Sequence, residues 1–211
     1  ESMGLKERKA REKQARRRQI IDAARSLLLE KGLQATSINQ IAKRAELAVG
    51  TIYFYYASKE ALFAELQGEG LELLMEKIRQ ESSAVIDPKE RLRSMAMVYY
   101  DFSREHKDYF DIINYFLSSP SVLLTSNLKQ DVDQRMHKIL VAIDATLAQG
   151  VDKGIFRERV QESHGVLLLA AFHGLMQFRK FESTIFNGIS HRTLYKRAVG
   201  HLLDGMAATL M

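Results

Sequence analysis

The chain has 211 residues, of which 46% are hydrophobic and 27% are charged, with two prolines, no cysteine and no tryptophan. This balance is typical of a globular protein, and it excludes a disordered chain, a collagen-like repeat and a disulfide-stabilised scaffold. The net charge of +5 at pH 7 is modest for the whole chain, so its meaning depends on where the basic residues lie.

The excess positive charge lies in residues 1–18, which hold eight basic and three acidic side chains, whereas the rest of the chain holds 23 of each. A concentrated basic segment indicates contact with something anionic. A membrane surface is disfavoured, because residues 6–18 contain no large apolar side chain that could insert into it. The most apolar run, residues 166–178, is too short to span a bilayer. Because the chain lacks cysteine and a signal-like leader, we expect a cytoplasmic protein.

The hydrophobic spacing is helical along almost the whole chain, and no segment alternates as a strand would. We therefore expect an all-α fold of about nine helices. The first helix is expected at about residues 7–31, where it buries a stripe that includes Ile20 and Leu27 and ends at Gly32. Residues 1–16 form a basic N-terminal extension of this helix.

Residues 36–60 predict two short helices joined by a tight turn. Thr36 or Ser37 can cap the first helix, which buries a narrow apolar face, and residues 46–48 form the turn. The second helix covers residues 49–55. Two short helices with a three- or four-residue turn have the geometry of a helix-turn-helix, which places its second helix in the major groove of DNA.

Caps, prolines at first helical positions and glycines after helix ends place the other helices. The expected segments are residues 58–80, a helix starting at Asp87-Pro88, a helix starting at Ser119-Pro120 and reaching about residue 149, and helices at about residues 160–186 and 190–210. The last two are separated by Asn187-Gly188, a typical turn sequence.

Residues 17–66 resemble the DNA-binding segment of the TetR family of one-component transcriptional repressors, and beyond residue 66 only the helical architecture is similar. The matching residues are Ile21, Ala23, Ala24, Gly32, Thr36, Ser37, Ile41, Ala42, Gly50-Thr51-Ile52-Tyr53, Ser58-Lys59-Glu60 and Leu62. The resemblance implies a homodimer in which residues 17–66 bind double-stranded DNA. Residues 67–211 would then form a helical domain for effector binding and dimerisation.

The turn departs from the family pattern at two positions. The family usually has glycine where this chain has Glu46, and a left-handed backbone at this residue would cost about 1–2 kcal/mol. The second short helix often has a serine cap where this chain has Ala48, a loss of about 1 kcal/mol. Neither departure removes a side chain that reads bases, so we expect DNA binding to be retained.

The outward face of the second short helix is the expected DNA reader. A helical projection points Val49, Ile52 and Tyr56 inward, points Gly50, Thr51, Phe54 and Tyr55 outward, and leaves Tyr53 at the margin. Gly50 permits close backbone approach, and Thr51 can contact a thymine methyl group or a base edge. The alternative for the four aromatic residues is a plain core cluster, which is favoured for Tyr56 and disfavoured for Tyr55.

The predicted DNA contacts come from three places in the helix-turn-helix segment. They are Thr36, Ser37 and Asn39 near the start of the first short helix, Gly50, Thr51, Tyr53 and Tyr55 on the second, and Lys59 at the start of the next helix. The resemblance implies phosphate or base-edge contacts for the two tyrosines and a phosphate contact for the lysine. Phosphate contacts position the protein, whereas groove contacts specify the sequence.

Residues 90–180 are rich in aromatic side chains and methionine. Most are expected in the core, but the family architecture implies a cavity among these helices, and methionine adapts well to apolar ligands. The candidate lining residues are Met97, Tyr100, Phe110, Ile113, Phe116, Met136, Phe172 and Met176, with His137, His173 and Gln177 as candidate polar anchors. A purely structural role is the alternative for each. The expected effector is a small, apolar or amphipathic molecule.

The last two helices are expected to form a four-helix bundle with a second copy of the chain. Their apolar residues are Leu167, Leu168, Ala171, Leu175, Leu202, Leu203 and Met206. A dimer presents two reader helices to successive major-groove faces about 34 Å apart, or a multiple of a turn, which predicts a palindromic operator.

The sequence therefore predicts a repressor that its effector releases from DNA. The alternatives are an architectural DNA-binding dimer without an effector and a helical ligand-binding or enzymatic protein that does not bind DNA. An enzyme is not expected, because the chain has no phosphate-cradling glycine loop, no G-x-S-x-G and no H-E-x-x-H. The six histidines lack metal-ligand spacing, so neither a metal nor a cofactor is expected.

Overall fold

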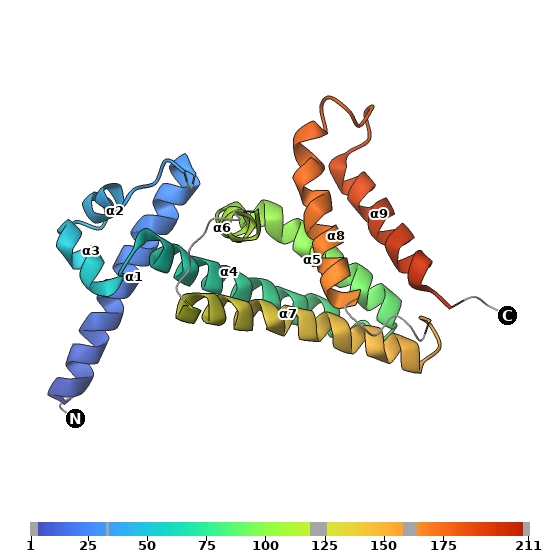
Figure 1. The fold of residues 1–211 in the computed structure, drawn as a ribbon, viewed down its shortest axis with the longest axis horizontal. Helices are drawn as coiled ribbons and strands as arrows, with labels where there is room; N and C mark the ends of the chain where they lie inside the picture. The colour runs from blue at the N-terminus through green and yellow to red at the C-terminus, as the bar shows by residue number, and fades with distance from the viewer. Residues whose placement is uncertain (1–3, 33, 119–125, 158–163, 209–211) are drawn as a thin grey trace. The chain divides into compact units, whose positions relative to one another are not determined.

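The computed structural model describes residues 4–32, 34–118, 126–157 and 164–208, and these residues are almost entirely helical (Figure 1). The helices are α1 (Leu5–Lys31), α2 (Ile38–Arg44), α3 (Val49–Tyr55), α4 (Lys59–Ser82), α5 (Pro88–Glu105), α6 (Lys107–Ser118), α7 (Ser126–Asp152), α8 (His164–Gln177), the 3-10 helix η2 (Phe178–Phe181) and α9 (His191–Met206). In these ranges the only strand-like pairing is an isolated bridge between Phe156 and Ala207. Within the described residues, the predicted all-α class and the number of about nine helices are confirmed.

The helices group into two compact units, which we describe one at a time. The first unit contains α1, α2, α3, the part of α4 that ends at Gly70, α6, and α7 as far as Val132. The second contains α4 from Leu71, α5, α7 from Asp133, α8 and α9. Helix α6 thus belongs with the N-terminal helices, although it follows α5 in the chain.

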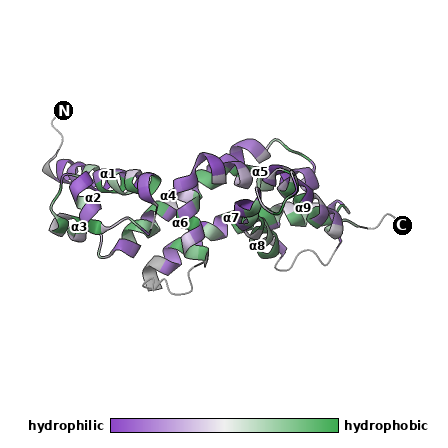
Figure 2. Cartoon of the chain, turned by 90° about the horizontal axis from the view of Figure 1, so that it is seen from above, coloured by the Kyte–Doolittle hydropathy of each residue, from purple (hydrophilic) through white to green (hydrophobic). Residues whose placement is uncertain are grey.

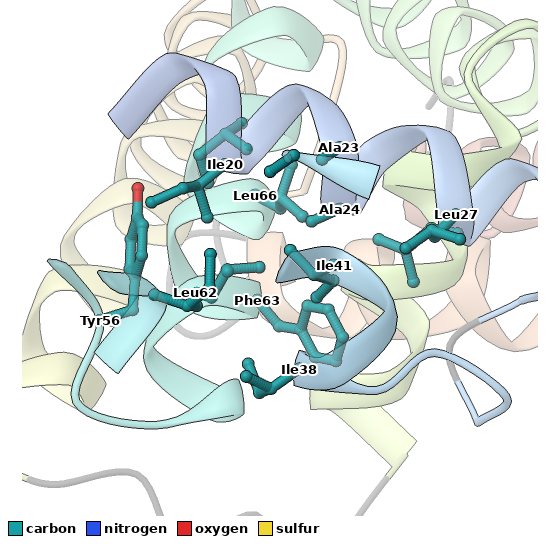
Figure 3. Packing of buried hydrophobic residues seen from close by; sticks show 14 of the residues in the cluster. Ile20, Ala23, Ala24, Leu27, Ile38, Ile41, Tyr56, Leu62, Phe63 and Leu66 are labelled. Atoms are coloured by element: carbon teal, nitrogen blue, oxygen red, sulfur yellow. The ribbon is translucent and has the colours of Figure 1, made fainter. Parts of the chain in front are cut away.

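One apolar core holds the first unit together (Figure 3). The side chains labelled in the close-up come from α1, α2, α4 and the residue after α3; they are Ile20, Ala23, Ala24, Leu27, Ile38, Ile41, Tyr56, Leu62, Phe63 and Leu66. Ile112 of α6 is fully buried in the same cluster, and Tyr109 and Phe116 pack against it. Helix α6 therefore supplies part of the core beneath the helix-turn-helix.

The core of the second unit forms where α5 meets α8 and α9. The Tyr195 hydroxyl donates a hydrogen bond of 3.0 Å to the Ala96 carbonyl, and its ring centroid lies 5.1 Å from that of Tyr100. An ion pair between Arg192 and Asp101 joins α9 to α5 at the surface. Figure 2 shows hydrophilic and hydrophobic residues interleaved along the helices, as expected where each helix buries one face.

Two helix boundaries differ from the sequence prediction. The chain that follows Asp87-Pro88 forms two helices, α5 and α6, separated at His106, where no proline or glycine marks the break. The helix predicted to reach residue 186 ends at Gln177 instead, and η2 and a series of turns follow it. The Glu182 carboxylate in these turns accepts a hydrogen bond of 2.8 Å from the His191 N–H, at the start of α9.

Two predicted features lie outside the described residues. The helix start at Ser119-Pro120 is one of them, and the first residues of the helix predicted at 160–186 are the other. The predicted break at Asn187-Gly188 is confirmed, because both residues have a positive φ, 50° and 81°, in the turn before α9.

Candidate nucleic-acid interface

Ser37 begins α2 with a capping box. Its hydroxyl accepts a hydrogen bond of 3.3 Å from the Gln40 N–H, and the Gln40 amide oxygen accepts one of 3.1 Å from the Ser37 N–H. Thr36 is only 1% exposed, and its hydroxyl donates a hydrogen bond of 2.8 Å to the Gly32 carbonyl. Three residues here were predicted to bind phosphate. Ser37 and Asn39 are exposed to solvent, whereas the Thr36 side chain is buried and does not reach the surface.

The turn between α2 and α3 depends on a left-handed residue. Glu46 has a φ of 54°, and its N–H donates to the Lys43 carbonyl at 3.2 Å. The Leu47 N–H donates to the Ala42 carbonyl at 2.9 Å, and this pair of bonds is the Schellman motif. The Leu47 side chain packs against the core. The turn therefore places Glu46 in a left-handed conformation that is usually adopted by glycine.

Helix α3 has a buried side and an exposed side. Ile52 is fully buried, and Tyr56, the residue after the helix, is 3% exposed. Tyr53 and Phe54 are 51% and 78% exposed, and no atom lies within 4 Å of the position that a Cβ on Gly50 would occupy. The outer side of this seven-residue helix thus presents the rings of Tyr53 and Phe54 and the uncovered backbone at Gly50.

The helical projection of α3 is wrong at some positions. Val49, expected to point inward, is 37% exposed, because the first turn of so short a helix extends past the core. Tyr55 is half-buried against the core, with its ring edge-on to Phe54 at 5.2 Å. Tyr53 is more exposed than its marginal position predicts, and Thr51 is half-buried. The exposed surface of α3 is therefore centred on Gly50, Tyr53 and Phe54.

Side chains of α1 fix the positions of the two short helices. The Gln19 amide donates a hydrogen bond of 2.7 Å to the Ala45 carbonyl at the end of α2. Arg17 pairs with Glu65 of α4, and its guanidinium lies 5.1 Å from the centroid of the Tyr56 ring. Burial and the Glu65 carboxylate raise the pKa of the Tyr56 phenol, which therefore stays protonated. These contacts hold the exposed face of α3 in one orientation.

Lys59 lies at the first residue of α4, just after α3. The Ser58 hydroxyl accepts a hydrogen bond of 3.1 Å from the Ala61 N–H and so caps this helix, as predicted. The Lys59 ammonium lies 5.2 Å from the centroid of the Phe63 ring and remains half-buried. A bound phosphate would meet this lysine at a helix N-terminus, where the helix dipole also favours an anion.

Sequence reasoning missed a groove between α1 and α2, with a volume of about 570 Å³. It is lined by Leu27, Lys31, Gln40, Lys43, Arg44 and Glu46. Arg44 is held there by an ion pair of 2.6 Å with Glu30. The groove could not be predicted from its basic residues, because lysine and arginine are common in the last turn of any helix.

The predicted effector residues divide between the two units. In the second unit Tyr100, Phe172 and Met176 are buried and Met97 and Met136 are half-buried; in the first unit Phe110 and Ile113 are buried and Phe116 is half-buried, all on α6. The Tyr100 ring lies against His191 and Tyr195, at centroid distances of 5.5 and 5.1 Å. Tyr100 thus fills the core of its unit.

The candidate polar anchors have different surroundings. The Tyr99 hydroxyl lies 2.7 Å from His173 Nδ1, and the Gln177 amide nitrogen lies 3.2 Å from His173 Nε2. Burial lowers the pKa of His173, so its imidazole is held neutral. His137 is exposed. The structure therefore joins two of the three candidates in one small polar network with Tyr99.

The predicted dimer helices leave part of their apolar surface uncovered. Leu168 and Leu203 are buried in the unit, whereas Leu167 and Leu202 are 60% and 37% exposed. Val166, beside Leu167, is 53% exposed. Exposed apolar residues that gather on neighbouring helices mark an interaction surface.

The described residues bring together no group of three or more histidine, aspartate or glutamate side chains that could hold a metal ion. Among the same residues, no helix is both long and apolar enough to cross a membrane.

Comparisons with known proteins match this geometry. The model of the family described as "Bacterial regulatory proteins, tetR family" matches residues 20–66. The fatty acid metabolism regulator protein of Bacillus subtilis is 30% identical over 155 residues, which cover 70% of this chain and 74% of that protein. The transcriptional repressor KstR2 of Mycobacterium tuberculosis is 28% identical over 147 residues, or 68% of this chain and 70% of the repressor.

Solved structures share the fold. FadR from Bacillus subtilis, in complex with stearoyl-CoA, aligns with a TM-score of 0.69 at 20% identity, over 89% of this chain and 98% of FadR. The fatty acid degradation regulator FadR from Bacillus halodurans aligns with a TM-score of 0.67 at 21% identity, over 96% and 97% of the two chains. The named relatives are transcription regulators and not enzymes. This chain belongs to the TetR family, and it is a DNA-binding, helix-turn-helix transcription regulator.

Proposed function

We propose that the chain is a dimeric repressor that binds a palindromic operator through α3 and leaves it when an effector binds. The observation that carries the proposal is the exposed face of α3. Tyr53 and Phe54 are 51% and 78% exposed although the neighbouring Ile52 is fully buried. Large aromatic side chains held in the open on a rigid helix are suited to a partner surface, and the major groove accepts a helix of this kind.

The proposed contacts on α3 lie at Gly50 and Tyr53, which are exposed, and at Thr51 and Tyr55, which are half-buried. Gly50 lets the backbone approach the bases, while Thr51, Tyr53 and Tyr55 contact base edges or phosphates. The exposed Ser37 and Asn39, together with Lys59, bind phosphates on either side of α3. Thr36 is buried, so it acts by positioning the start of α2 through its bond to Gly32.

The proposed dimer uses α8 and α9. Exposed Val166, Leu167 and Leu202 support this arrangement, because they leave an apolar surface for a second copy to cover. Two copies of α3 related by a two-fold axis would bind half-sites about 34 Å apart, or a multiple of one helical turn. The operator is therefore expected to be an inverted repeat.

The proposed effector is an apolar or amphipathic molecule, and a long-chain acyl-CoA is the first to test. The name of the fatty acid metabolism regulator and the stearoyl-CoA bound to Bacillus subtilis FadR support this choice. In this chain the candidate contacts of the second unit are Met97, Tyr100, Met136, Phe172 and Met176, and those of α6 are Phe110, Ile113 and Phe116. The neutral His173 and its partner Tyr99 could meet a polar group of such a ligand.

The experiment is a footprint of the purified chain on the DNA upstream of its own gene. The chain should protect an inverted repeat, and the double variant Tyr53→Ala/Phe54→Ala should lose that protection. Ile86→Ala, at an apolar residue that is 80% exposed in the second unit, is the matched control and should protect the same bases. No specific protection by the parent chain, or full protection by the α3 variant, would contradict the proposal.

The effector is tested on the same fragment. Stearoyl-CoA should weaken operator binding by about 5- to 150-fold, and the operator must weaken stearoyl-CoA binding by the same factor. A constitutive DNA-binding dimer predicts no change in either affinity. A reporter gene placed behind the protected fragment gives the sign of regulation, and repression should be relieved by the ligand.

A further inference from the structure

The N-terminal part of α1 projects from the first unit as a solvated helix. Residues 6–16 are all exposed, and Figure 1 shows the N-terminal end of α1 extending beyond α3. The Gly4 N–H donates a hydrogen bond of 3.1 Å to the Glu7 carboxylate, which closes the first turn. The segment consists of strong helix formers, with no glycine, proline or β-branched residue between Leu5 and Arg18. The extension before Arg17 is about 18 Å long at 1.5 Å per residue.

Three lysines of this extension continue the face of α1 that packs against the domain. Lys13 precedes the buried Ile20 by seven residues, and Lys9 and Lys6 precede it by 11 and 14. At about 100° per residue, all three point within about 40° of the direction of Ile20. We call Lys6, Lys9 and Lys13 the lysine stripe. In the exposed N-terminal part of α1, the lysine stripe therefore takes the place of the apolar stripe on the same side of the helix.

The lysine stripe lies on the side of α1 that packs against the core cluster of the first unit. Ile20 shares its core cluster with Ile52 of α3 and with Tyr56. Arg17, one turn after Lys13, stacks on the Tyr56 ring at 5.1 Å. A ligand bound to the outer face of α3 would therefore meet the stripe as it extends past the domain.

The charges of the lysine stripe are not neutralised by other side chains of the described residues. In the part of the chain that the structure describes, Lys6, Lys9 and Lys13 form no ion pair or hydrogen bond. The nearby acids are used elsewhere, since Glu7 closes the first turn and Glu12 pairs with Arg8 at 3.3 Å. Like charges three and four residues apart destabilise a free helix by a few tenths of a kcal/mol, about 0.2–0.5 for each pair. An anionic partner would remove this repulsion.

We propose that the lysine stripe binds backbone phosphates of the duplex beside the half-site that α3 reads. This inference rests on the proposed function, because it uses α3 to place the DNA. Lys6 and Lys13 are separated by about 10.5 Å along the helix, close to the axial rise of three base pairs of DNA at about 3.4 Å each. The partner is DNA and not a lipid surface, because residues 6–18 contain no large apolar side chain that could insert into a membrane.

The opposite face of the same helix supplies a matched control. Arg8, Arg11 and Arg18 point about 120–180° away from Ile20, and all three are exposed. The stripe variant is Lys6→Gln/Lys9→Gln/Lys13→Gln, and the control variant is Arg8→Gln/Arg11→Gln/Arg18→Gln. Glutamine keeps the helix propensity close to that of lysine and arginine, and both variants lose three positive charges. Far-UV circular dichroism verifies that both variants keep their helix content.

The probe is a random-sequence duplex of about 30 base pairs, because phosphate binding does not depend on sequence. Affinity is measured by fluorescence anisotropy between about 50 and 300 mM KCl for the full chain and both variants. Each phosphate contact adds about 0.9 to the slope of log affinity against log salt concentration, so the stripe variant should lose about 2.7 per protomer. The control variant should lose less than about one third of that.

Equal losses in the two variants would overturn the proposal, since they would show a diffuse effect of net charge. Unchanged slopes in both would overturn it as well. Binding of the parent chain to phosphatidylserine vesicles but not to the duplex would overturn it in favour of a membrane partner. The α3 variant Tyr53→Ala/Phe54→Ala separates the two proposals. It should lose the operator footprint but keep the salt slope on random DNA, so each proposal can fail while the other holds.

Discussion

Replacing Glu46 with glycine tests the geometry of the helix-turn-helix. Glu46 has a φ of 54° and occupies the left-handed position of the Schellman motif that ends α2. Its side chain is exposed and forms no hydrogen bond or ion pair within the described residues. Glutamate is therefore strained by its Cβ and receives no compensating contact there. We expect Glu46→Gly to stabilise the chain and to keep DNA binding.

The magnitude follows from two opposing terms. Relief of the left-handed strain contributes about 1–2 kcal/mol. The greater freedom of glycine in the unfolded chain costs about 0.5–1 kcal/mol. With the middle of each range, the net gain in unfolding free energy is about 0.75 kcal/mol, which for a chain of this size raises Tm by about 1.5–3 °C.

Urea unfolding followed by circular dichroism measures this gain, at matched protein concentration because the proposed dimer would make stability depend on concentration. Glu46→Ala is the control, since it removes the same charge but keeps the Cβ, and it should give no gain. Equal stabilisation by both variants would show that charge and not backbone strain is responsible. A loss of stability in Glu46→Gly, or a complete loss of DNA binding, would refute the placement of the turn.

Three further changes test local features by the same unfolding assay. Ser37→Ala removes the cap of α2 and should cost about 1 kcal/mol, whereas Ser37→Asp should restore most of it. Gly150→Ala would bring a Cβ within 2.2 Å of the Phe156 ring, and it should destabilise by about 1–3 kcal/mol; an unchanged midpoint would contradict this crowding. His173 has a folded-state pKa below its ordinary value of about 6.5, so the unfolded chain binds more protons and stability should fall as the pH drops below that value. His173→Gln should lose this acid-side decline, and an identical pH profile would show that the histidine does not titrate in this way.

The helix-turn-helix could be predicted from the sequence because its signals act over a few residues. The Ser37 cap, the i, i+3 spacing of Ile38 and Ile41, and the short interval before Val49 are all local. The strain at Glu46 was also visible, because its position in the turn, not its side chain, sets its backbone conformation. Side-chain directions on α3 were harder to predict, since a seven-residue helix buries only its middle and its end.

The assignment of α6 to the first unit could not be predicted. Its hydrophobic spacing indicates a helix, but spacing does not say which core a helix joins. The break at His106 also carries no proline or glycine, so α5 and α6 could not be separated in the sequence. The effector residues present the same difficulty. An apolar side chain such as Tyr100 has the same pattern whether it fills a core or lines a pocket.

Helix α6 is joined to α1 and α4 of the first unit by close contacts. The Tyr109 hydroxyl donates a hydrogen bond of 3.1 Å to the Glu69 carboxylate, which also pairs with Arg25, and the Arg25 guanidinium lies 5.3 Å from the Tyr109 ring centroid. A Cβ on Gly70 would lie 2.9 Å from the Tyr109 Cβ, so the two helices are in contact at the backbone. Because close-packed elements do not deform continuously, a shift of α6 must displace α1 and α4 or break these contacts. The same α1 orients the two short helices, so the orientation of the reader helix depends on where α6 is held.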